Sequence, residues 1–197
     1  MYLQVLGFLN GPDPPEWRYD ASVAYFKNKL YYLGGEEPKA WIREKMKRVD
    51  VLIDGKWQTG PAFPFPVDEV QTITCDGLLY GHIIAYSLCN CGYSVIDEGW
   101  TQGIYRLSDD EREWIEVGKI EGGRYSCAVA LLNGKIYITG GQEPSFCGVN
   151  VKTFKSCLCF DPSAPIDSRV SKIADMNYER HDHLLIVANG KLYAIGG

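Results

Sequence analysis

The sequence predicts an all-β protein built from several small antiparallel sheets, and three observations support this. The segments KNKLYYLGG (27–35), NGKIYITGG (133–141) and NGKLYAIGG (189–197) repeat one order of turn, alternating strand and glycine pair, and DGLLYGHII (76–84) is a weaker copy. The composition, with 13 Tyr, 7 Phe, 5 Trp, 21 Gly and 10 Pro, is typical of short strands joined by many turns. The sequence contains no apolar run of about 18 residues, so it predicts no membrane-spanning helix.

The copies keep a common period. Their tyrosines, Tyr31, Tyr80, Tyr137 and Tyr193, are separated by 49, 57 and 56 residues. Thirteen residues before them stand Arg18, Val67, Arg124 and Arg180. Trp57 and Trp114 are 57 residues apart, and Phe8 and Val170 fall in register with them. Because two independent sets of positions keep one spacing, the chain is predicted to consist of internal repeats.

The third copy shows how each unit is expected to fold. An apolar strand over 124–132 is followed by Asn133-Gly134, the favoured pair for a type I′ hairpin turn. The next strand, KIYIT, places Ile136 and Ile138 on one face and Tyr137 on the other. Gly140-Gly141 then lets the backbone turn sharply or approach a neighbour closely.

A third and a fourth strand complete each unit. The third strand is predicted at 49–53, 103–107 and 156–160, and the fourth carries Trp57, Trp114 or Val170. Since one four-stranded sheet cannot bury both of its faces, such sheets are expected to stack around an axis as the blades of a β-propeller. The Tyr of the second strand and the Trp of the fourth would then pack between blades.

The pattern of Arg, apolar strand, Asn-Gly-Lys-Ile/Leu-Tyr, Gly-Gly and a later Trp resembles the kelch repeat. The resemblance covers nearly the whole chain, and the paired glycines that carry it are Gly34-Gly35, Gly140-Gly141 and Gly196-Gly197. The second repeat departs from the pattern because Ile83-Ile84 replaces the glycine pair. The third repeat has Val170 where Trp is usual.

The resemblance implies a single kelch-type propeller over 1–197, with about three complete blades and partial blades at both ends. The predicted limits are 1–17 for the fourth strand of a preceding blade, 18–66, 67–123 and 124–179 for three repeats, and 180–197 for the start of another. Two arrangements remain open. The chain is either a piece of a larger propeller, which we expect, or its first strand and last hairpin meet in a three-stranded fourth blade that leaves no open edges.

The loops between the second and third strands, and between one repeat and the next, are predicted to emerge at one face. Long loops on a rigid scaffold commonly carry binding, and aromatic and Arg side chains are typical of protein-binding hot spots. The candidate partner-binding residues are Arg18, Tyr19, Trp41, Tyr93, Trp100, Arg124, Tyr125, Ser126, Phe146, Arg180 and His181. Two alternatives stay open: the arginines bond the backbone of a neighbouring blade, and Tyr19 and Tyr125 belong to the core.

Metal binding and catalysis are not predicted. His181 and His183 would lie on one strand face, but a metal needs three or four convergent ligands and the remaining histidine, His82, is two repeats away. Cys89-x-Cys91 and Cys157-x-Cys159 lack zinc-knuckle spacing, and the second pair is interpreted as packing thiols. No nucleophile elbow, P-loop or H-E-x-x-H motif occurs, so neither a cofactor nor an enzyme is expected.

The resemblance implies a protein-interaction module. Kelch propellers resemble the substrate receptors of cullin-3 ubiquitin ligase adaptors, whose BTB and BACK domains precede the propeller, and also actin-associated scaffolds. The alternative is a metal-dependent enzyme similar to galactose oxidase. The net charge of −5 gives no attraction to nucleic acid or an anionic membrane. An odd number of cysteines, 7, favours a reducing cytoplasm, with the nucleus as a further possibility.

Overall fold

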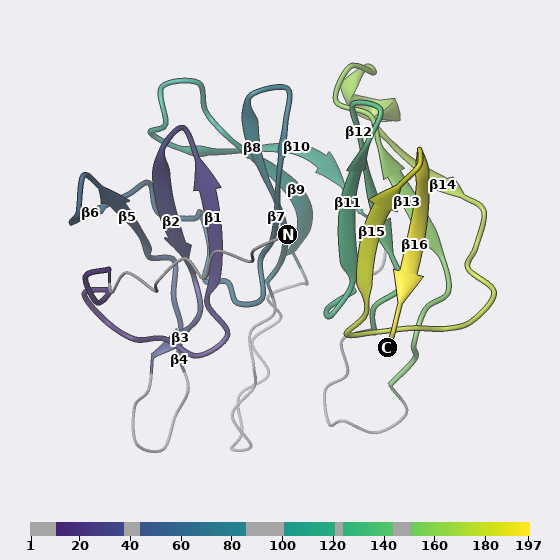
Figure 1. Cartoon of the computed structure of the whole chain (residues 1–197), viewed down its shortest axis with the longest axis horizontal. Coiled ribbons are helices and arrows are strands. Elements are labelled where there is room, and N and C mark those ends of the chain that lie inside the picture. Colours follow the sequence, from purple (N-terminus) through teal and green to yellow (C-terminus); the bar gives the residue numbers. More distant parts are fainter. Residues whose placement is uncertain (1–10, 38–43, 86–100, 121–123, 144–150) are drawn as a thin grey trace, which may run out of the picture.

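The computed structural model of the chain describes residues 11–37, 44–85, 101–120, 124–143 and 151–197. It confirms the predicted all-β architecture. Three four-stranded antiparallel sheets stand side by side in sequence order and are followed by a two-stranded hairpin (Figure 1). The predicted strand around Phe8 lies outside the described residues.

Each sheet is a simple meander. Blade 1 contains β1 (Ser22–Phe26), β2 (Lys29–Leu33), β5 (Val49–Ile53) and β6 (Lys56–Thr59). Blade 2 contains β7 (Gln71–Cys75), β8 (Leu78–Ala85), β9 (Thr101–Leu107) and β10 (Trp114–Lys119). Blade 3 contains β11 (Ala128–Leu132), β12 (Lys135–Thr139), β13 (Cys157–Phe160) and β14 (Val170–Ile173). The final hairpin is β15 (Leu184–Ala188) and β16 (Lys191–Ile195).

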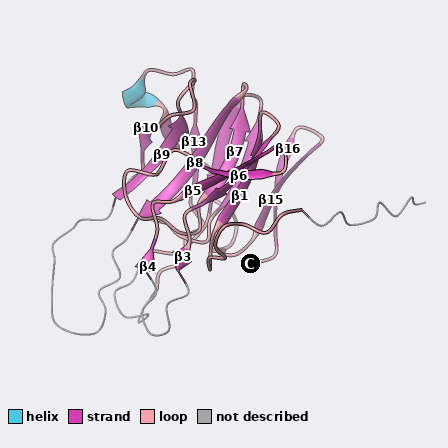
Figure 2. Cartoon of the chain, turned by 90° about the vertical axis from the view of Figure 1, so that its left-hand side faces the viewer, coloured by secondary structure: helices cyan, strands magenta, loops and turns pink. Residues whose placement is uncertain are grey.

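Two small elements mark opposite ends of the blades. A short ribbon of β3 (Glu36–Glu37) and β4 (Glu44–Lys45) extends blade 1 at one end, and the 3₁₀ turn η1 (Ile166–Ser168) lies at the other end (Figure 2). We call the end with β3 and β4 the loop rim. It is the lower end in Figure 1, and the connections from blade 1 to blade 2 and from blade 3 to the final hairpin also pass there.

The hairpin turns form where the sequence predicts them. Asn133 and Gly134 have φ values of 51° and 72°, and Asn189 and Gly190 have values of 50° and 67°. Asp76-Gly77 and even Lys27-Asn28 adopt the same left-handed conformation. Positive φ at both central residues is what a type I′ turn requires, so this position closes the first hairpin of every repeat.

The paired glycines act as junctions between blades. Gly35 donates its N–H to the carbonyl of Val67, which precedes blade 2, over 2.8 Å. A Cβ placed on Gly35 would lie 2.7 Å from the carbonyl oxygen of Tyr19, in the segment that enters its own blade. Gly141 repeats both features, with a 2.8 Å bond to Arg180 and a 2.7 Å approach to Tyr125. The glycines are therefore required both for positive φ and for close backbone contact.

Blade 2 lacks the glycine pair, and its strands change accordingly. With Ile83-Ile84 in place of the glycines, β8 continues to Ala85, and β9 begins at Thr101, which pairs with Ala85. A side chain at either position disfavours the left-handed turn, so the strand continues instead.

Two hydrophobic cores lie between the three blades. Tyr31 and Trp114 belong to the core between blades 1 and 2, and Tyr80 and Phe160 belong to the core between blades 2 and 3. Trp114 stacks on Phe63 with 4.6 Å between ring centroids and donates its Nε1–H to the carbonyl of Pro61. Aromatic residues at the positions that keep the repeat period therefore contribute to both cores between the blades.

The repeat positions at the two ends of the array are more exposed. Trp57 is half-buried, and its Nε1–H bonds the carbonyl of Pro12, so the segment entering blade 1 covers it in the way that Pro61 covers Trp114. Tyr137, which is followed only by the hairpin, is half-buried, and Tyr193 on that hairpin is 43% exposed. Burial at these positions follows the presence of a neighbouring blade.

This difference gives a direct test of inter-blade packing. Tyr31 is 1% exposed, so Tyr31→Ala is expected to lower the free energy of unfolding by about 3 kcal/mol through lost burial and a cavity. Tyr193→Ala, at the equivalent position, is expected to cost under about 1 kcal/mol. Urea unfolding followed by circular dichroism measures both values, and equal losses would contradict the stacking of blades through this tyrosine.

Candidate functional site

The loop rim is organised by arginines in the segments that enter blade 1, blade 3 and the final hairpin, whereas blade 2 has Val67 at this position. Arg18 donates from Nη1 to the carbonyl of Arg48 (2.9 Å) and from Nη2 to Asp50 Oδ2 (2.9 Å). Arg124 donates from Nη1 to the carbonyls of Gly140 (3.2 Å) and Ser156 (3.0 Å). Each arginine thus ties the segment before its blade to the loop between the second and third strands of the same blade.

These contacts correct part of the predicted site. The side chain of Arg18 is buried, and Arg124 is 4% exposed, so neither guanidinium is available to a partner at the rim. Arg180 bonds the carbonyl of Gly196 in the same way, although it is partly exposed beside the short hairpin. The alternative that the arginines bond backbone is therefore what the structure shows for all three, but within their own blade and not a neighbouring one.

Arg18, Val67, Arg124 and Arg180 are the entry positions of the four repeats. Two residues after each of them, the backbone adopts a positive φ. Asp20, Glu69, Ser126 and Asp182 all have positive φ, between 47° and 53°. The N–H of Glu69 bonds the carbonyl of Asp20, and the N–H of Asp182 bonds the carbonyl of Ser126, each over 2.9 Å. Equivalent residues of adjacent blades are thus linked directly through the backbone. We call these four residues the rim ring.

The rim ring is acidic. Burial raises the pKa of Glu69, and the nearby carboxylates of Asp68, Asp20 and Asp182 raise it further, while Lys45 acts in the opposite direction. Ser126 Oγ lies 3.5 Å from Glu69 Oε2. Carboxylates contributed by segments entering three different repeats therefore influence one another at this end of the molecule, which creates a negative potential at the rim.

Aromatic side chains lie on the same entry segments. Tyr19 is 54% exposed, Trp17 is 66% exposed and Tyr178 is 70% exposed. Tyr125 is half-buried, and burial raises its pKa with a further contribution from Glu69. Of the predicted residues, Tyr19, Tyr125, Ser126 and His181 lie at the rim, while Trp41, Tyr93, Trp100 and Phe146 lie outside the described residues.

The sequence reasoning missed Glu69 and the two exposed aromatic residues Trp17 and Tyr178. A signal for Glu69 existed, because it occupies the same repeat position as Ser126, which was predicted. The degenerate second repeat, with Val67 in place of the entry arginine, concealed it. Exposure of Trp17 and Tyr178 has no such signal in the sequence.

The histidines do not form the predicted pair on one strand face. Asp182 has a φ of 51°, so the chain bends there, and β15 begins only at Leu184. His183 is buried with its Nε2 2.8 Å from Thr139 Oγ1, whereas His181 is partly exposed. Over the ranges that the structure describes, no group of three or more His, Cys, Asp or Glu side chains could hold a metal ion.

The cysteines that the structure describes are Cys75, Cys127, Cys157 and Cys159, and all four are buried. Burial raises the pKa of Cys127 to about 12, so this thiol stays protonated and unreactive at neutral pH. In the same ranges, no helix is long and apolar enough to cross a membrane.

Comparison with known proteins agrees with this architecture. A family model of the Kelch motif matches residues 123–177, which fall on the third repeat. Kelch-like protein 15 of Danio rerio is 33% identical over 205 residues, covering 96% of this chain and 31% of that protein. The Homo sapiens protein of the same name is 31% identical over the same length. Kelch repeat protein M-T8 of Myxoma virus is 28% identical over 137 residues, covering 68% of this chain and 24% of that protein.

Four-stranded antiparallel blades, joined at paired glycines and packed through periodic aromatic residues, define a repeat protein of the β-propeller class. The chain belongs to the kelch-repeat family. It spans 31% of the length of the Kelch-like protein 15 relatives.

The buried pair at the entry to blade 1 can be tested. Asp50→Ala would leave the buried guanidinium of Arg18 without its carboxylate, and we expect a loss of about 3 to 5 kcal/mol in the free energy of unfolding. The exposed Asp13→Ala serves as control, with an expected change under about 0.5 kcal/mol. Chemical denaturation measures both, and a near-neutral Asp50→Ala would show that this pair does not hold the entry segment.

The contact between blade 3 and the hairpin should depend on pH. Burial lowers the pKa of His183 below its ordinary value of 6.5, and Arg180 and His181 lower it further. Because the folded state binds the proton less readily than the unfolded state, the neutral imidazole contributes stability that is complete above pH 6.5 and is lost as the pH falls below it.

We therefore expect His183→Asn to flatten the pH dependence of the melting temperature between about pH 7 and 5, the interval in which histidine titrates. The comparison variant His181→Asn changes a partly exposed histidine that lowers the pKa of His183 but keeps His183 itself, so it should reduce the slope less than His183→Asn does. Differential scanning fluorimetry across this range measures both variants. If the melting temperature of His183→Asn changed with pH as steeply as that of the parent, this histidine would be excluded as the source of the pH dependence.

Proposed function

We propose that this chain is a non-catalytic protein-interaction module that binds its partner at the loop rim. The observation that carries the proposal is the combination of the rim ring with exposed Tyr19, Trp17 and Tyr178 at the entry segments. Kelch-family relatives over nearly the whole chain support an interaction role.

The rigid base beneath the rim supports this function. The entry segments are fixed by buried arginines, by backbone bonds to the neighbouring blade and by the glycine junctions. Side chains held on such a base lose little conformational freedom when a partner binds, which favours affinity. Since the rim ring is acidic, the partner we expect carries Lys or Arg side chains with apolar or aromatic neighbours.

In a longer chain, the resemblance points to the substrate receptor of a cullin-3 ubiquitin ligase adaptor, with an actin-associated scaffold as the second proposal. The BTB and BACK domains of such adaptors do not occur in these 197 residues, so the adaptor role concerns a longer protein. We place the protein in the cytoplasm, in keeping with the odd number of cysteines. Co-sedimentation with filamentous actin separates the two proposals.

The rim is tested by neutralising the ring without changing its shape. The variant combines Asp20→Asn, Glu69→Gln and Asp182→Asn, which keep residues that tolerate the left-handed conformation at two of the three sites. A partner captured from cell extract and purified should bind this variant at least about tenfold more weakly, because the charge attraction across the interface is lost. Tyr19→Ala should weaken binding similarly.

The matched control removes three charges at the opposite end of the molecule. It combines Asp109→Asn, Glu113→Gln and Asp167→Asn, all exposed. Biolayer interferometry with the purified partner compares the two triple variants. Equal weakening by both would mean that net charge and not the rim decides binding, and loss only in the control would place the interface at the other end.

A further inference from the structure

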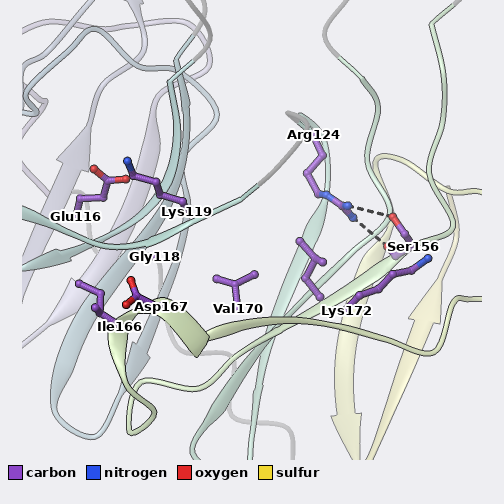
Figure 3. A pocket seen from close by; sticks show the side chains of 10 residues that line it. Glu116, Gly118, Lys119, Arg124, Ser156, Ile166, Asp167, Val170 and Lys172 are labelled. Atoms are coloured by element: carbon purple, nitrogen blue, oxygen red, sulfur yellow. Dashed lines mark hydrogen bonds between the residues drawn. The ribbon is translucent and has the colours of Figure 1, made fainter.

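A cleft of about 810 Å³ opens between blades 2 and 3. One wall is formed by β10, and the other by β13, β14 and the turn η1. Beside it, Arg169 bridges the blades by donating to the carbonyl of Val117. Figure 3 shows Arg124, Ser156 and Lys172 on one side of the cleft, and Glu116 and Lys119 on the other. This cleft shares no residue with the rim ring, so the inference does not rest on the proposed function.

The repeat makes Arg124 the equivalent of Arg18, but their side-chain partners differ. The guanidinium of Arg18 lies over the Tyr32 ring and that of Arg124 over the Phe154 ring, and only Arg18 has a carboxylate partner among the described residues. Arg18 Nη2 bonds the carboxylate of Asp50, which faces Tyr32 across β2 and β5. In blade 3, the residue at the position of Asp50 is Leu158, which faces Ile138 across β12 and β13. Arg124 Nη2 bonds only the hydroxyl Oγ of Ser156, over 3.0 Å.

Arg124 is therefore a buried cation to which the described part of the chain supplies no countercharge. Among the residues that the structure describes, no carboxylate forms an ion pair with it, and its Nε has no hydrogen-bond partner. Burial lowers its pKa, but a guanidinium stays charged at any physiological pH. A charge removed from water and not paired is costly, so an anion that reaches it gains more than at an exposed site.

The wall around Arg124 adds to this preference. Lys172 lies on the same side of the cleft, and although it pairs with Asp175 over 3.4 Å, it is largely exposed. Leu158, Val170 and Ile166 supply an apolar lining. The carboxylates of the cleft, Glu116 and Asp167, are exposed and belong to the region away from Ser156 (Figure 3).

We propose that the cleft between blades 2 and 3 binds an acidic side chain of a partner peptide, and that this carboxylate supplies to Arg124 the countercharge that Asp50 supplies to Arg18 in blade 1. The carboxylate is held by Arg124, Ser156 and Lys172. Apolar residues next to it in the peptide rest on Leu158 and Val170.

The probe is a capped tripeptide with Glu between two Leu residues, and its Gln counterpart is the control ligand. Binding is followed by NMR, through the Nε–H signal of Arg124 and the backbone amides of Ser156 and Leu158. We expect saturable shifts with the Glu peptide and at least about tenfold weaker binding of the Gln peptide, in line with the strength of charge-assisted hydrogen bonds. Equal binding of the two peptides would overturn the proposal.

Two variants of equal shape test the missing carboxylate. Leu158→Asp supplies the carboxylate from within the chain, as Asp50 does in blade 1. It should lower the affinity for the Glu peptide at least about tenfold. Leu158→Asn has the same size without the charge, and like Leu158→Asp it loses the apolar contact with the peptide. The comparison is therefore between the two variants, and Leu158→Asn should bind the Glu peptide at least about tenfold more tightly than Leu158→Asp. Circular dichroism checks that both fold, and equal affinities in the two variants would contradict the inference.

Two further substitutions keep the test decisive. Lys172 is largely exposed. Lys172→Gln should lower the affinity for the Glu peptide and leave the affinity for the Gln peptide unchanged. Glu121 lies close in sequence to Arg124 but outside the described residues. If Glu121→Gln raised the affinity for the Glu peptide tenfold or more, Glu121 of the chain itself would supply the countercharge to Arg124. The proposal of a partner site would then fail.

Discussion

The close backbone contact at the paired glycines is the constraint on which the rest of the structure depends. At Gly35 and Gly141, the chain leaves the second strand of a blade, touches the segment that entered that blade and donates a hydrogen bond to the segment entering the next. A side chain at either position would collide with a carbonyl oxygen. One glycine pair thereby fixes the position of two entry segments, and these segments carry the candidate site.

A different kind of contact holds the opposite end of the first two blades together. Glu111, in blade 2, accepts hydrogen bonds from Lys29 Nζ (2.5 Å) and Tyr31 Oη (2.7 Å) of blade 1. Although burial acts to raise the pKa of Glu111, these hydrogen bonds lower it, so the carboxylate stays charged at neutral pH. Backbone contacts at the rim and side-chain contacts at the far end therefore both limit how the blades move relative to each other. This leaves the rim side chains as the variable part.

The departures from the repeat are as informative as the repeat itself. Equivalent positions share backbone geometry, so a change of residue type there changes chemistry without moving the scaffold. The replacement of Asp50 by Leu158 turns a neutralised guanidinium into a buried cation beside a cleft. The replacement of the glycine pair by Ile83-Ile84 lengthens one strand and removes one junction. Functional differences between blades of a repeat protein can arise from single positions of this kind.

The sequence by itself determined the repeat, its turns and its strands, because these depend on local conformation. Asn133-Gly134 favours a type I′ hairpin turn through its own backbone conformation. The alternation of residues facing opposite sides around Tyr137 favours a strand. Which repeat positions are buried was decided by the tertiary structure, since Tyr31 lies in a complete blade with a neighbouring blade against it and Tyr193 lies in a two-stranded hairpin with none. The same holds for the site. Arginines that resemble rim-binding residues in sequence instead donate hydrogen bonds within their own blades. The rim ring joins residues about one repeat apart, which only the stacking of the sheets brings into contact.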